Sequence, residues 1–267
     1  MVTLTCFRRF YRCRVRLGVI PYCAASPSSV GYAVSTPIAI RIQSNIVAVR
    51  ERQLLNYLCA RMPAWVSPDG LTIFGVAGAF TVFAGYAGSR YDPSFLWLAT
   101  LGFVIHWFGD SLDGSLARHR RIERPKYGYF LDHSVDAFCN LFIMAGLGLT
   151  FYVRMDVALF VLIGYYLLCM YVFLNNHVTG LFQLSFLALG PTELRIGLIG
   201  LNTWMFMQGK VGGTIGGEFF SLYDIALICV GIGFVTVFTY RMLGTIAELR
   251  REATQRETLS HFKQREP

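Results

Sequence analysis

Residues 110–136 read DSLDGSLARHRRIERPKYGYFLDHSVD and hold four of the chain's eight aspartates. Asp110 and Asp113 are three residues apart, and Asp132 and Asp136 are four apart. On helices, both spacings put the two members of a pair on one face. Carboxylates in or near a membrane are costly to keep there, so they indicate function. The stretch therefore predicts two acidic half-sites on adjacent helices.

The composition of the whole chain predicts a polytopic membrane protein. Hydrophobic residues make up 54% of it and charged residues only 15%, whereas soluble domains have about 25% charged residues. The net charge of +8 gathers in the N-terminal arm, in residues 118–126 and after Arg241. These basic segments border apolar spans and are suited to contact anionic lipid headgroups. No nucleic-acid motif accompanies them, so no nucleic-acid partner is expected.

We expect an all-α fold, with six transmembrane helices preceded by an interfacial amphipathic helix. Residues 41–62 form the amphipathic helix, which can lie in the membrane interface. A soluble linker helix is the alternative interpretation. The polar face would hold Arg50, Glu51, Arg52 and Asn56. The apolar face would hold Ile42, Ile46, Val49, Leu54, Leu58 and Met62.

Six apolar stretches follow the amphipathic helix and are the expected membrane spans. They are Leu71–Gly88, Ser94–Ala117, Tyr127–Tyr152, Val157–Leu174, Leu194–Met207 and Leu222–Leu243. Residues 63–245 would thus be one catalytic membrane domain. Residues 1–40 are expected to be a disordered or mis-started basic extension, and residues 246–267 a polar cytoplasmic tail.

The basic residues also predict an orientation. With a cytoplasmic N-terminus and six spans, the basic loop at 118–126 and the C-terminal tail both face the cytoplasm, in agreement with the positive-inside rule. The four aspartates then lie together just below the inner membrane surface. A bacterial inner membrane fits this arrangement, with the site open to the cytoplasm.

Four converging carboxylates cannot all stay ionised in a low-dielectric site without cations. Mg²⁺ and Mn²⁺ prefer oxygen ligands, so either ion would balance the charge. Two such ions about 3.5–4 Å apart suit phosphoryl or phosphodiester displacement. The carboxylates therefore predict a two-metal site for Mg²⁺ or Mn²⁺.

Small and basic residues stand between the aspartates in a fixed pattern. The pattern is Asp110-x2-Asp113-Gly114-x2-Ala117-Arg118, followed by Gly128-x3-Asp132-x3-Asp136. At every fixed position it resembles the signature of the CDP-alcohol phosphotransferase family. It departs in one respect, because nine residues separate Arg118 from Gly128 where the family usually has eight. The resemblance covers about residues 41–245.

The resemblance implies roles for the matched residues. Asp110, Asp113 and Asp132 would be metal ligands, and Asp136 would complete the metal site and act as general base. The nucleotide of the donor would lie against Asp110, Gly114, Ala117, Arg118 and Gly128. The family attacks the β-phosphate of a CDP-alcohol with the hydroxyl of an acceptor alcohol or lipid and releases CMP, in phospholipid biosynthesis. A homodimer is the expected assembly.

The acceptor alcohol is less constrained by the sequence. His133, directly after Asp132, resembles the choline/ethanolamine phosphotransferase branch, where it would assist deprotonation. A histidine bonded to a neighbour and catalytically idle is the alternative. The candidate acceptor-binding residues are Asn140, Asn176, Glu193 and Arg195. For the last two, a helix cap or a snorkelling pair is the alternative.

Two further alternatives remain at this stage. Within the family, a CDP-diacylglycerol donor with a soluble acceptor competes with a CDP-amino alcohol donor and a diacylglycerol acceptor, and only His133 favours the second. Outside the family, the aspartates could be the transit site of a cation transporter or channel. Transport sites usually lie near the bilayer midplane, whereas these aspartates cluster at one end of their spans, so the transporter is disfavoured.

Overall fold

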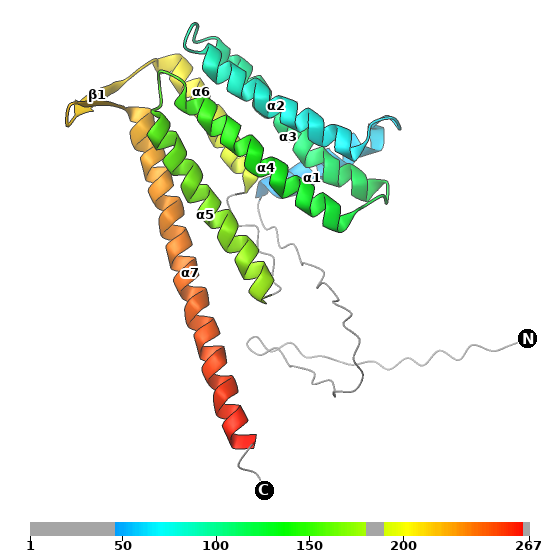
Figure 1. Cartoon of the computed structure of the whole chain (residues 1–267). Coiled ribbons are helices and arrows are strands. Elements are labelled where there is room, and N and C mark those ends of the chain that lie inside the picture. Colours follow the sequence, from blue (N-terminus) through cyan, green and yellow to red (C-terminus); the bar gives the residue numbers. More distant parts are fainter. Residues whose placement is uncertain (1–45, 180–189, 264–267) are drawn as a thin grey trace, which may run out of the picture. The chain divides into compact units, whose positions relative to one another are not determined.

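The computed structural model describes residues 46–179 and 190–263 and confirms the all-α class (Figure 1). The expected extension at 1–40 lies outside the described residues. A short antiparallel hairpin, which the sequence did not predict, interrupts the described helices. The elements are α1 (Ile46–Arg61), α2 (Pro68–Gly88), α3 (Phe95–His119), α4 (Pro125–Gly148), α5 (Met155–Thr179), α6 (Pro191–Gln208), β1 (Gly212–Ile215), β2 (Glu218–Ser221) and α7 (Leu222–Lys263).

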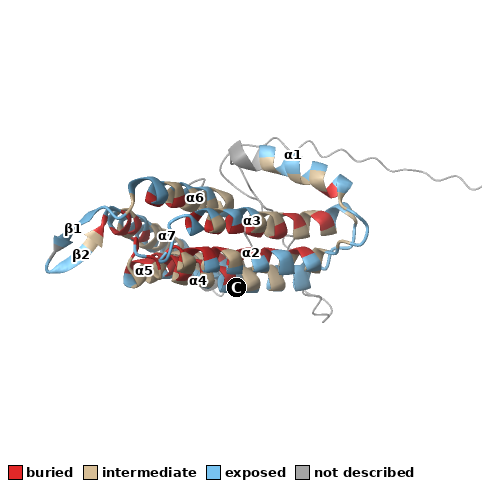
Figure 2. Ribbon diagram, turned by 90° about the horizontal axis from the view of Figure 1, so that it is seen from above, coloured by how far each residue is buried: buried red, intermediate tan, exposed pale blue. Residues whose placement is uncertain are grey.

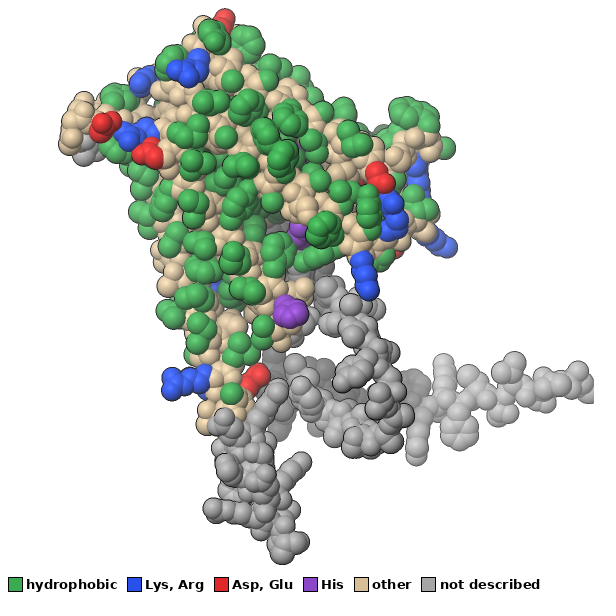
Figure 3. Space-filling model, in the orientation of Figure 1, with side chains coloured by type: hydrophobic (Ala, Val, Ile, Leu, Met, Phe, Trp, Pro, Cys, Tyr) green, Lys and Arg blue, Asp and Glu red, His purple; other side chains and the backbone are tan. Residues whose placement is uncertain are grey.

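Five helices of the described chain, rather than the expected six, are long and apolar enough to cross a membrane. They are α2, α3, α4, α5 and α7. The expected span Leu194–Met207 falls within α6, which has only 18 residues and includes Glu193, Arg195 and a buried Asn202. Hydrophobic side chains cover most of the face drawn in Figure 3, with charged side chains near its edges. The protein is therefore an integral membrane protein with an outward-facing apolar surface.

α1 packs against α3. Cys59 is buried, and Leu55, Leu58 and Met62 pack around the same small apolar cluster. Leu54, expected on the apolar face, is 45% exposed, as a side chain that faces the membrane interface would be. One detail of the predicted amphipathic pattern was wrong. Glu51, expected on the polar face, accepts a hydrogen bond from Trp107 of α3. The side of α1 that carries Glu51 therefore faces α3.

Glycines allow α2 and α3 to pack with their backbones in contact. A Cβ atom at Gly78 would overlap the backbone of His106, and one at Gly109 would overlap the backbone of Gly75. Small residues permit this close approach between membrane helices. Ser67 fixes the start of α2, because its hydroxyl accepts from the Gly70 amide at 3.0 Å. The close packing brings the first turns of α2 against the acidic end of α3.

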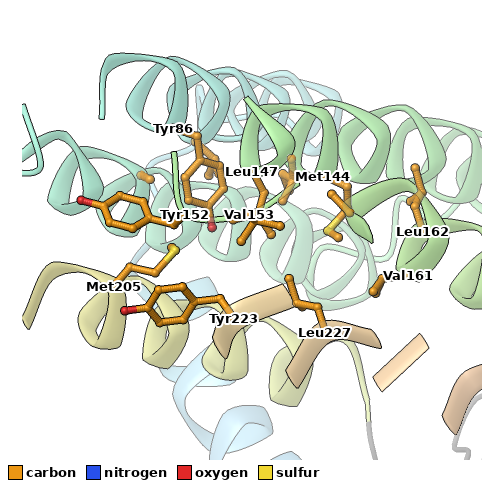
Figure 4. Close-up of a cluster of buried hydrophobic side chains, with 14 of the residues drawn as sticks. Tyr86, Met144, Leu147, Tyr152, Val153, Val161, Leu162, Met205, Tyr223 and Leu227 are labelled. Carbon is orange, nitrogen blue, oxygen red and sulfur yellow. The ribbon is translucent and has the colours of Figure 1, made fainter. Parts of the chain in front are cut away.

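The main core lies where α2 to α7 meet on the side away from the acidic end. Side chains from several helices converge there, among them Tyr86, Met144, Leu162, Met205 and Tyr223 (Figure 4). In Figure 2, buried residues follow α2 and α3, whereas α1 and the hairpin are mostly exposed. The core includes one polar link, in which the Tyr86 hydroxyl donates to Asn202 at 2.8 Å. This link joins α2 to α6 inside the bundle.

α7 runs beside α5 and continues past the expected end at Leu243 (Figure 1). Its first turn is held by Asp224, which is 1% exposed and accepts from the backbone amides of Ser221 and Arg154. The helix ends at Lys263, so most of the segment expected to be a polar tail is a continuation of this helix. No glycine or proline lies between Gly244 and Pro267, so no helix-breaking residue ends α7 earlier.

Candidate active site

The four motif aspartates converge on one pocket, as their spacing predicted. Asp110 and Asp113 come from α3, and Asp132 and Asp136 come from α4. α2 supplies the third wall. The lining residues are Thr72, Gly75, Val76, His106, Asp110, Asp113, Asp132, Val135 and Asp136.

Three of these carboxylates lie close enough together to hold a metal ion. Asp110, Asp132 and Asp136 each offer an oxygen, and the three oxygens lie within 4.8 Å of one another. All three residues are half-buried. An acidic set of oxygen donors matches the preference of hard divalent cations. The residues therefore fit the metal site that the sequence predicted.

Asp113 lies in the same pocket but is held from a different direction. Its Oδ2 accepts a hydrogen bond of 2.7 Å from the Thr72 hydroxyl on α2. The hydrogen bond fixes one carboxylate oxygen and leaves the carboxylate half-buried beside the other three. A partner that orients a ligand in this way is a usual part of metal sites.

α6 contributes a cation to the acidic cluster. Arg195 Nη2 donates to Asp110 Oδ2 at 2.6 Å, and it lies 3.4 Å from His106 Nε2. His106 is 3% exposed, and its Nδ1 is 3.0 Å from the Gly75 carbonyl oxygen. A carbonyl only accepts, so the proton resides on Nδ1 and Nε2 faces Arg195 as an acceptor. Arg195 is thus held by two groups of α3.

The predicted nucleotide-binding residues lie toward the basic loop. Arg118 folds back over its own helix, where its Nη2 donates to Ser115 Oγ at 3.2 Å. A Cβ at Gly114 would be 3.3 Å from the Arg118 guanidinium, so this glycine leaves the space that the arginine uses. Gly128 has open space around it, and Ala117 is half-buried on the last turns of α3.

Two arginines of the basic loop hold it against the start of α2 and the segment before α2. Arg120 donates through both Nη atoms to the carbonyls of Pro63 and Val66, at 2.7 and 2.5 Å. Arg124 forms a salt bridge of 2.6 Å with Asp69. The loop that follows Arg118 is therefore fixed to α2.

The other predicted residues do not line the pocket. His133 stacks on Tyr129, with ring centroids 4.3 Å apart, and approaches Phe173 of α5; its Nδ1 is 3.2 Å from Asp132. Asn140 lies one turn beyond Asp136 on α4, and Asn176 lies near the end of α5; both are half-buried. Glu193 accepts from the Gly190 amide at 2.9 Å, so it caps α6. Arg195 is the one predicted acceptor residue that reaches the aspartates.

Three polar residues in the pocket or next to it were missed in the sequence. His106 stands one helical turn before Asp110, and this spacing in an apolar stretch was a usable signal. Thr72 gave no signal, because its role depends on the α2–α3 packing. Glu51 was assigned to a solvated face, and only the position of α1 against α3 reveals its contacts.

Similarity to known proteins identifies the family of this chain. Over 97 residues the chain is 29% identical to cholinephosphotransferase 1 of Danio rerio, covering 34% of this chain and 25% of the relative. Over 102 residues it is 34% identical to archaetidylinositol phosphate synthase of Pyrococcus horikoshii, covering 38% of this chain and 51% of the relative. The matches thus span a quarter and about half of these relatives. Residues 65–237, well over half of the chain and including all four pocket aspartates, match the family model for CDP-alcohol phosphatidyltransferase, and the chain therefore belongs to this family.

Proposed function

We propose that this protein transfers a phospho-alcohol group from a CDP-alcohol to the hydroxyl of an acceptor alcohol, with release of CMP, in phospholipid biosynthesis. The observation that carries the proposal is the convergence of Asp110, Asp132 and Asp136 within 4.8 Å, inside a segment that matches the family. The relatives named above are transferases or synthases whose names point to the same class of lipid chemistry.

The aspartates would bind Mg²⁺ or Mn²⁺, with Asp110, Asp113, Asp132 and Asp136 as the ligands. Bound there, divalent ions would polarise the phosphoanhydride and balance the charge of the leaving phosphate. The half-buried pocket supports this assignment, because carboxylates that lie close together need compensating positive charge. Arg195 supplies part of that charge through Asp110.

In the proposed step the acceptor hydroxyl oxygen bonds to the β-phosphorus of the donor. The bond from that phosphorus to the bridging oxygen breaks, and CMP leaves with the electron pair. Asp136 takes the proton of the hydroxyl, as its position on the α4 side of the pocket allows. Arg118, beside Gly114, would bind the nucleotide phosphates, and Ala117 and Gly128 would leave room for the cytidine end.

The acceptor would bind near Arg195, since this guanidinium reaches the pocket from α6. Asn140, Asn176 and Glu193 are weaker acceptor candidates, because their positions are away from the pocket lining. His133 would assist deprotonation only if its ring turned from Tyr129 toward the pocket. Both donor classes remain open: one relative is named for choline phosphate transfer and the other for a synthase of an archaeal inositol lipid.

We propose that the pocket faces the cytoplasm of a bacterial inner membrane and that the protein forms a homodimer. The basic loop that includes Arg118, Arg120, Arg121 and Arg124 lies beside the pocket, which supports a cytoplasmic orientation under the positive-inside rule.

A donor screen tests the proposed function. Purified full-length protein in lipid nanodiscs would receive CDP-choline or CDP-ethanolamine with diacylglycerol, and CDP-diacylglycerol with soluble polyols or their phosphates, each with Mg²⁺ or Mn²⁺. One donor class should release CMP in a metal-dependent way, and Asp113→Asn and Asp136→Asn should abolish that release. The absence of CMP with every donor, or undiminished release by either variant, would overturn the proposal. Metal uptake into proteoliposomes without CMP release would favour a transporter.

A further inference from the structure

Glu51 of α1 is bonded to both helices that form the Asp110–Arg195 ion pair. Its Oε1 accepts a hydrogen bond of 2.8 Å from Trp107 Nε1 on α3 and one of 2.9 Å from the Thr192 hydroxyl on α6. The Ser111 hydroxyl of α3 lies 3.5 Å from the same oxygen. One carboxylate oxygen thus joins three helices that are far apart in the sequence.

The donors to Glu51 are close neighbours of the site residues. Trp107 follows His106, and Ser111 follows Asp110, while Thr192 precedes Arg195 by three residues on α6. Residues three apart lie on the same side of a helix. Thr192 and Arg195 therefore both face α3, where one bonds to Glu51 and the other to Asp110. The Glu51 hydrogen bonds thus form a second link between α6 and α3, about one helical turn from the Asp110–Arg195 ion pair.

Two other contacts of α6 lie within its first turn or farther along the helix. The Glu193 cap on Gly190 is internal to the first turn. The buried link through Asn202 lies about two turns away from Arg195. The placement of Arg195 therefore rests on its own contacts with Asp110 and His106 and, through Thr192, on Glu51.

We propose that Glu51 is a positioning residue that holds the first turn of α6 against α3 and so sets the place of Arg195 in the acceptor half of the site. The inference rests on the proposed function for its readout. α1 would then help to position a group of the active site. Glu51 itself lies before residue 65, where the family match begins.

Two substitutions at Glu51 separate positioning from simple packing. Glu51→Ala removes the acceptor of both hydrogen bonds, and displacement of a substrate-binding group by about 1 Å can cost about 100-fold in rate. We expect the KM for the acceptor to rise and kcat/KM to fall at least 10-fold, with the KM for the CDP-alcohol unchanged. Glu51→Gln keeps an oxygen that accepts from Trp107 and Thr192, so it should retain most of the activity.

Arg52→Ala is the matched control, because Arg52 is exposed on the same helix and, within the described residues, forms no hydrogen bond to α3 or α6. It should match the wild type in both KM values. Equal acceptor KM in Glu51→Ala and Arg52→Ala would overturn the inference. If Glu51→Ala lost activity only because less of the protein folded, with the acceptor KM unchanged, the inference would also be overturned.

Thr192 provides a test that does not depend on the folding of the Glu51 variant. Thr192→Val removes the hydroxyl and keeps the shape, so it should raise the acceptor KM in the same direction, and Thr192→Ser should restore it. The acceptor KM of the double variant Glu51→Ala/Thr192→Val should be little higher than that of Glu51→Ala alone, because the two side chains act through one hydrogen bond. Full additivity would contradict the proposal. Absence of CMP release by the wild type would instead overturn the proposed function, so the two failures are distinguishable.

Discussion

Asp110 on α3 and Arg195 on α6 form an ion pair of 2.6 Å, with side chains that are 20% and 12% exposed. The pair brings a permanent positive charge into a cluster of four carboxylates and occupies Oδ2 of Asp110. Asp110 also offers an oxygen within 4.8 Å of oxygens of Asp132 and Asp136. The acidic site is therefore lined by α2, α3 and α4, and Arg195 of α6 compensates part of its negative charge.

Replacing Arg195 should damage both stability and activity. Arg195→Gln leaves the half-buried Asp110 without its cation, and removal of one partner from a buried pair costs about 3–5 kcal/mol. Thermal unfolding in detergent would measure the stability, and CMP release the activity. Arg154→Gln is the control, because Arg154 pairs with the exposed Asp156 and Glu218 at the other end of the protein. Exposed pairs are worth about 0–1 kcal/mol. An equal fall in unfolding temperature in Arg195→Gln and Arg154→Gln would contradict the idea that burial makes the Asp110–Arg195 pair important.

Removing the Thr72 hydroxyl should weaken metal binding through Asp113. Thr72→Val keeps the side-chain shape but deletes the donor to Asp113 Oδ2. Loss of such a supporting contact typically costs about 10- to 100-fold in metal affinity or activity. The Mn²⁺ concentration that gives half-maximal CMP release should rise by at least 10-fold.

Thr81→Val on the same helix is the control for Thr72. Its hydroxyl donates to the Ala77 carbonyl of α2 itself, away from the pocket. The metal dependence of this variant should equal that of the wild type. If both variants shifted alike, a general effect on α2 would be the better explanation.

The sequence predicted the helices and the acidic cluster because both depend on local patterns. Apolar stretches marked the spans, and the spacing of the aspartates placed each pair on one face. Contacts between distant helices were not predictable in the same way. Thr72 and Glu51 became site residues only through the packing of α2 and α1 on α3. The hairpin was also missed, since its turn at Gly216 and Gly217 joins strands of only four residues.

The close packing of α2 on α3 should be sensitive to a single methyl group. Gly78→Ala would press a Cβ into the backbone of His106, which cannot move without shifting α3. Overpacking of this kind costs about 1–3 kcal/mol or more. We expect a lower unfolding temperature in detergent and a loss of CMP release, since His106 supports Arg195.

Gly233→Ala is the matched control for this substitution. Gly233 lies in α7 and has no atom within 4 Å of an added Cβ. Alanine is favoured over glycine inside helices by about 0.5–1 kcal/mol. The control should therefore be as stable as the wild type or more stable. A neutral Gly78→Ala would show that the helices separate more easily than their contact suggests.

Arg120 should matter more to the basic loop than Arg124, although both are arginines of the same segment. The Arg120 guanidinium donates to the carbonyls of Met62, Pro63, Ala64 and Val66. Hydrogen bonds to charged groups contribute about 1.5–3 kcal/mol. Arg120→Ala should therefore loosen the segment between α1 and α2 and expose it to proteolysis near residue 64.

Arg124→Ala is the comparison. It breaks one salt bridge whose side chains are 55% and 45% exposed, so the cleavage rate of this variant should stay near that of the wild type. Limited proteolysis in nanodiscs, with cleavage sites read by mass spectrometry, compares the two directly. Faster cleavage in Arg124→Ala than in Arg120→Ala would contradict the role given to the four carbonyls.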